Sequence, residues 1–143
     1  MFKKIFNKEK TNDTRFEDKN ILIAALLIHA AKIDDNYTNF EKEIIKKALM
    51  GLYKIKTNEA DKLLELAEKK EQVSNQIIEF TREIKKNSME FRLKIIEILW
   101  KIVYSDGTSD NYESNLIRRV CGLLYVSDKD SGIIKLKVKN LMK

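Results

Sequence analysis

The segments at residues 34–41 and 106–113 have the sequences DDNYTNFE and DGTSDNYE. Each consists of an aspartate, six residues rich in oxygen-bearing side chains, and a glutamate. Each lies between two apolar stretches with helical spacing. The stretch before the first segment, residues 21–31, is apolar in nearly every position, as expected of a helix surrounded by other helices. The pattern predicts two helix–acidic loop–helix units.

The rest of the chain also favours helices. Its 143 residues contain no proline and 4 glycines, the residues that hairpins and tight turns need. Apolar periodicity predicts a bundle of about seven helices, in which Phe40 and Ile78 face inward. Expected helix starts, marked by capping residues, are Asp18 or Asn20, Thr38, Thr57 or Asn58, Ser74, Ser88, Asp110 and Ser127. We therefore predict a single all-α domain.

An internal repeat appears when the sequence is shifted by 72 positions. Ile23 then aligns with Ile95, Asp34 with Asp106, Glu41 with Glu113 and Tyr53 with Tyr125. In all, 8 of the 33 residues from 21 to 53 are identical to their counterparts. The repeat predicts that two similar helical hairpins pack about a pseudo-twofold axis.

The net charge of +6 is concentrated at the ends of the chain. Residues 1–10 have four lysines and one glutamate, residues 135–143 have four lysines and no acid, and residues 11–134 carry a net charge of −1. A nucleic-acid-binding domain concentrates basic residues on one face of its fold, so we do not expect such a partner. We predict a basic flexible leader (1–16), a helical domain (17–134) and a basic end of the last helix or tail (135–143).

The sequence is typical of a cytoplasmic protein. Its single cysteine, Cys121, cannot form an internal disulfide and suits a reducing compartment. The apolar run 21–31 is shorter than the ~20 residues that a membrane span needs. The first ten residues lack the apolar core of a secretory signal.

The acidic segments allow two interpretations. Glu41 and Glu113 follow Thr38 and Asp110 by three residues, the spacing of a capping box, which would explain both glutamates. The first aspartate of each segment follows a helix C-terminus, where the helix dipole disfavours negative charge by ~0.3–1 kcal/mol. A loop donor or a hard divalent cation such as Ca²⁺ or Mg²⁺ could offset that cost. The spacing does not fit an EF-hand, because the glutamate comes at position 8 instead of 12.

Residues 30–45 and 100–120, which contain both segments, resemble the tellurite-resistance TerB family. This family shares its fold with the N-terminal region of the co-chaperone DjlA. The resemblance covers residues 17–134 and implies a bundle of about seven helices with pseudo-twofold symmetry. It departs from the family at Asp35, where a glycine is usual. The resemblance also implies a divalent metal site (Ca²⁺, Mg²⁺, Mn²⁺ or Zn²⁺) formed by Asp34, Glu41, Asp106 and Glu113, with Asp35 and Asp110 as further candidates.

We therefore expect a non-enzymatic, metal-binding or metal-sensing interaction module in a stress response, with a protein partner. Two alternatives remain: a co-chaperone-type scaffold without metal, and a membrane-surface adaptor that uses residues 1–10. Catalysis is not expected. His29, the only histidine, lies in an apolar helix, and Cys121 lies on the core face of another. No catalytic triad or phosphate-binding loop is present in the sequence.

Overall fold

The computed structural model describes residues 16–33, 37–74, 76–106 and 111–141. These residues contain seven α-helices and one 3₁₀ helix. They contain no strand, so the predicted all-α class is confirmed. The helices are α2 (Asp18–Ala31), α3 (Asn39–Tyr53), α4 (Thr57–Val73), α5 (Ile77–Lys85), α6 (Met89–Val103), η1 (Tyr104–Asp106), α7 (Asn111–Leu124) and α8 (Asp128–Leu141). In the described part, no helix is long and apolar enough to cross a membrane.

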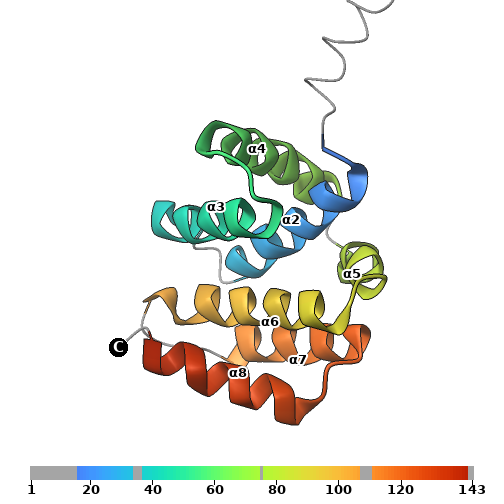
Figure 1. Ribbon diagram of the computed structural model, residues 1–143, viewed down its shortest axis with the longest axis vertical. Helices are drawn as coiled ribbons and strands as arrows, with labels where there is room; N and C mark the ends of the chain where they lie inside the picture. Colours follow the sequence, from blue (N-terminus) through green and yellow to red (C-terminus); the bar gives the residue numbers. More distant parts are fainter. Residues whose placement is uncertain (1–15, 34–36, 75, 107–110, 142–143) are drawn as a thin grey trace, which may run out of the picture.

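The helices form two groups of three with α5 between them (Figure 1). In the first group α2 packs against α3 and α4, and in the second α6 packs against α7 and α8. The groups meet where α2 and α3 contact α6. Helix α5 packs on α2 and on α7 and so contacts both groups. We refer to α2–α4 as the first half of the molecule and to α6–α8 as the second half.

The core is built around α2 and α6, the two most apolar helices. Residues 23–28 of α2 are all buried, as its continuous apolar sequence predicts. On α6 the buried residues are Ile95, Ile96, Ile98, Leu99, Trp100, Ile102 and Val103. Each fully buried leucine or isoleucine contributes roughly 1.5–3 kcal/mol of apolar transfer free energy, so these two helices dominate the hydrophobic stabilisation.

Capping residues decide several helix starts. Ser88 Oγ accepts a hydrogen bond from the Phe91 N–H (3.2 Å), and Ser127 Oγ accepts one from the Asp130 N–H (3.0 Å), as predicted. Three other predicted caps are wrong. Glu17 is the N-cap of α2 and Lys56 that of α4, while Ser74 ends α4 instead of starting the next helix. At α4 the Glu59 carboxylate accepts a hydrogen bond from the Lys56 N–H (2.8 Å), which is the half of a capping box that the glutamate supplies.

Phe40 and Ile78 do not face inward. Their side chains are 60% and 57% exposed. Phe40 precedes the buried Glu41 by one residue, and Ile78 follows the buried Ile77 by one. Neighbouring residues on a helix point about 100° apart, so on a helix with one solvent-facing side the neighbour of a core residue can point to solvent.

The helix bounds recur at nearly the predicted spacing of 72 residues. Helices α2 and α6 begin at residues 18 and 89, α3 and α7 at 39 and 111, and α4 and α8 at 57 and 128. Helices α3 and α7 also end alike, since Lys54 (φ 53°) and Tyr125 (φ 57°) adopt the left-handed conformation. The symmetry operation between the halves stays a prediction.

Candidate functional site

The predicted metal ligands lie at the two connections that leave α2 and α6. Asp34, Asp35 and Asp110 are outside the described residues. Asp106 ends η1 and Glu113 lies in the first turn of α7, but their side chains are not described. Glu41, at the start of α3, is therefore the candidate whose side chain can be placed. The convergence of these carboxylates stays a prediction; among the described residues no three potential ligands from His, Cys, Asp and Glu gather.

Glu41 closes a capping box with Thr38. Its Oε1 accepts a hydrogen bond from the Thr38 N–H (2.9 Å), and its own N–H donates to Thr38 Oγ1 (3.1 Å). The capping role predicted from the spacing is thus confirmed for the first segment. The side chain is only 6% exposed, which places a carboxylate inside the fold beside the acidic segment.

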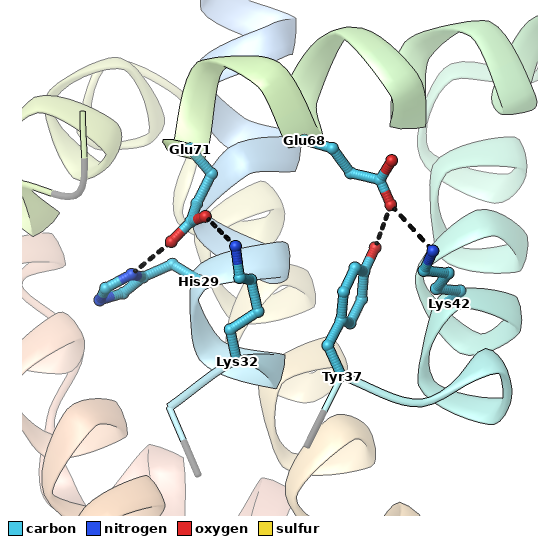
Figure 2. Close-up of polar contacts among 6 residues, drawn as sticks. All are labelled: His29, Lys32, Tyr37, Lys42, Glu68 and Glu71. Carbon is cyan, nitrogen blue, oxygen red and sulfur yellow. Dashed lines mark hydrogen bonds and ion pairs between the residues drawn. The ribbon is translucent and has the colours of Figure 1, made fainter. Parts of the chain in front are cut away.

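Two glutamates of α4 contact residues that come before, within and directly after that segment (Figure 2). Glu71 is 7% exposed; its Oε1 lies 2.8 Å from Lys32 Nζ and its Oε2 lies 3.1 Å from His29 Nδ1. Both partners are on or just after α2, ahead of residue 34. Figure 2 shows the two glutamates with the four residues that they contact. We call this set the α4 carboxylate cluster: His29, Lys32, Tyr37, Lys42, Glu68 and Glu71.

Glu68 makes the corresponding contacts within the segment and directly after it. Its Oε2 accepts a hydrogen bond from the Tyr37 hydroxyl (2.9 Å) and lies 3.5 Å from Lys42 Nζ. The Lys42 ammonium also lies 4.9 Å from the centroid of the Tyr37 ring, within the range of a cation–π interaction. Side chains from residues 29–32 and from residues 37–42 therefore both pair with carboxylates of α4.

Electrostatics favours one protonation state in this cluster. Burial alone would raise the pKa of Glu71, but hydrogen bonds from Lys32 and His29 outweigh it, and the pKa is lowered. Burial raises the pKa of Tyr37 well above its ordinary value, and the hydrogen bond to Glu68 raises it further. Around neutral pH, Glu71 is thus a carboxylate acceptor and Tyr37 a neutral donor.

No motif in the sequence predicts this cluster directly. Glu71 is 42 residues from His29 and 39 from Lys32, so their pairing depends on how α4 packs on α2. A weak signal was present in the spacing, because Glu68 and Glu71, like His29 and Lys32, are three residues apart and share a helix face. His29 is half-buried, and its ring lies 6.1 Å from that of Phe80 between centroids.

The second half has a neutral contact at its centre instead. Trp100 Nε1 donates a hydrogen bond to Ser131 Oγ (3.2 Å) in the interior between α6 and α8. Cys121 is buried next to it, as predicted, and burial raises the pKa of its thiol. A buried, protonated thiol is a poor nucleophile and metal ligand.

Comparison with known proteins supports the resemblance seen in the sequence. The family model described as "Tellurite resistance protein TerB" matches residues 20–136. No curated protein and no solved structure matches the chain. The matched range contains both acidic segments, all six candidate ligands and the α4 carboxylate cluster. Because the match covers most of the chain and its helical fold agrees with the expectation, this protein belongs to the TerB family.

Proposed function

We propose that this protein is a non-enzymatic interaction module that senses a divalent metal ion at its acidic segments in a stress response. The observation that carries the proposal is the attachment of residues 29–32 and 37–42 to Glu68 and Glu71. A ligand that changes the path of residues 34–36 acts directly on both attachments. The binding event can thereby reach α4, a surface that a partner can contact.

The metal would be held by Asp34, Glu41, Asp106 and Glu113, with Asp35 and Asp110 as additional ligands. These residues supply carboxylate oxygens, the donors that Ca²⁺, Mg²⁺ and Mn²⁺ prefer and that Zn²⁺ also accepts. Glu41 fits this role in one respect, because it is a buried carboxylate beside the acidic segment.

The test is thermal unfolding in EDTA and with Ca²⁺, Mg²⁺, Mn²⁺ or Zn²⁺ added separately. An ion at 100 times its Kd raises the free energy of unfolding by about 2.7 kcal/mol. We expect Asp34→Asn and Asp106→Asn to remove that gain. The matched control is Asp61→Asn, which changes an exposed carboxylate paired with Lys46 outside the segments. Absence of a shift with every ion would disprove metal sensing.

A metal-free scaffold is the second candidate function, and a different observation favours it. A groove between α3 and α6 provides a binding surface made only of described residues on two helices. Partner binding that is equal in EDTA and in excess metal would select this function.

A further inference from the structure

A groove of about 500 Å³ runs between α3 and α6, where the two halves face each other. Its lining residues form one stripe on each helix: Ile44, Lys47, Ala48, Gly51 and Leu52 on α3, and Lys94, Glu97, Ile98 and Lys101 on α6. On α3 the apolar members are spaced by about one helical turn and remain partly accessible. The groove is thus an accessible strip of apolar surface between two helices.

The rim of the groove is basic. It carries Lys47, Lys94 and Lys101 against a single acid, Glu97. Glu97 is already paired with Lys101 (3.3 Å) and with Lys137 of α8 (3.4 Å). Lys47 is exposed and has no ion pair among the described residues. Lys94 is paired with Glu90 (3.9 Å). With Lys137 included, four lysines at the rim face two acids, so the rim keeps an excess of positive charge that a ligand can neutralise.

Gly51 leaves space for a ligand in the groove. It lies in the last turn of α3, where glycine costs up to about 1 kcal/mol relative to alanine. A Cβ at this position would meet no atom within 4 Å. Packing within the described residues therefore does not require a glycine here. The left-handed position that ends α3, where glycine is favoured, is occupied by Lys54. Beside Ala48, Gly51 lets another backbone come close to the groove floor.

We propose that the α3–α6 groove binds an acidic amphipathic helix of a partner protein. The apolar stripe of that helix would lie on Ile44, Leu52 and Ile98, and its carboxylates would meet the three rim lysines. From residue 44 to residue 52 the floor extends about 12 Å along α3, or roughly two helical turns. The basic segment 1–10 is excluded as the occupant by charge, since it would bring four more lysines to the rim.

This inference rests on the interaction part of the proposed function and needs no metal ion. The probe is a 15-residue fluorescent peptide with leucines at positions i, i+4, i+7 and i+11 and glutamates on the flanks. Its control has lysines in place of the glutamates. Anisotropy is measured with the full-length protein, both in EDTA and with Ca²⁺. We expect the acidic peptide to bind at least about ten-fold more tightly than the basic one, and more weakly as salt rises.

Two glycine variants separate binding from folding. Gly51→Leu places a side chain in the groove without an internal clash, so we expect an unchanged or higher Tm and at least a ten-fold weaker affinity for the acidic peptide. Gly122→Leu on α7 has equally open surroundings away from the groove and should bind like the unmodified protein. Lys47→Glu should weaken binding as well.

Three results would overturn the proposal. The first is equal affinity for the acidic and the basic peptide, and the second is undiminished binding of the acidic peptide by Gly51→Leu. The third is self-association of the protein that Gly51→Leu abolishes, because the groove would then bind a second copy of the chain. Acidic-peptide binding in EDTA without any metal-induced shift in Tm would refute metal sensing while supporting the groove. A metal shift without peptide binding would do the reverse.

Discussion

The two halves of this protein share helix positions but differ in what joins their helices. In the first half the ionisable residues Glu68 and Glu71 connect α4 to α2 and to the start of α3. At a spacing of 72 their counterparts are Asn140 and Lys143, so the second half has no acid at those positions. Its buried polar contact, Trp100 to Ser131, is neutral. The ion pair that joins α6 and α8, Glu97 with Lys137, lies at the surface. Apolar spacing therefore maintains the scaffold in both halves, while the buried carboxylate of Glu71 distinguishes the first.

The largest effect should come from the second half. Trp100→Ala removes a buried indole and leaves a cavity between α6 and α8, which we expect to cost about 3–5 kcal/mol in the free energy of unfolding. Urea unfolding followed by circular dichroism measures it. Trp100→Phe keeps most of the packing and should cost clearly less. Equal losses for both variants would mean that the hydrogen bond to Ser131, not packing, is the main contribution.

An intermediate effect is expected in the first half. Glu71→Gln keeps the size of the side chain but removes the charge that pairs with Lys32 and His29. Breaking a buried pair costs up to ~3–5 kcal/mol, and because Lys32 is partly solvated we expect about 2 kcal/mol. Lys69→Gln, on the same helix but exposed, should change stability by less than about 0.5 kcal/mol. If the two variants were equal, the proposed importance of the cluster would be lost.

A smaller effect should follow loss of a cap. Thr38→Ala removes the acceptor for the Glu41 N–H and should cost about 1 kcal/mol. Ser127→Ala removes the N-cap acceptor of α8 in the second half and should cost about the same. Thermal unfolding of both variants compares them. A much larger loss for Thr38→Ala would show that this cap also supports the contacts of Tyr37 and Lys42 with Glu68 of α4.

The smallest expected difference concerns pH. The pKa of Glu71 is lowered from its ordinary value of 4.5 in the folded state. Its ionised form therefore stabilises the fold above about pH 4.5, and this contribution is lost as the pH falls through the folded-state pKa. The stability difference between wild type and Glu71→Gln should thus shrink as the pH falls below 4.5. A constant difference down to pH 3 would contradict the assigned ionisation.

The sequence was sufficient for features that depend on neighbouring residues. The Thr38–Glu41 box and the Ser88 and Ser127 caps involve residues three apart, and the buried α2 follows from its uninterrupted apolar run. Phe40 and Ile78 were misplaced because each adjoins a position that faces the core, and composition does not show which of two neighbours does so. Of the candidate metal ligands, only the capping role of Glu41 could be compared with a described side chain.

The α4 carboxylate cluster could not be predicted for a different reason. Its contacts join residues 26 to 42 positions apart, and they form only after α4 has packed against α2. Local spacing shows that Glu68 and Glu71 share a face of α4, but not which cations or hydroxyls lie opposite. Such pairings require the tertiary structure.

The burial of α2 has a consequence for folding cooperativity. This helix contacts α3 and α4 of its own half and also α5 and α6, so the apparent duplication does not yield two separable cores. Neither half can expose α2 without losing contacts that the other half needs. Unfolding should therefore be a single two-state transition, and the amide protons of residues 23–28 should exchange with solvent only when the whole molecule opens.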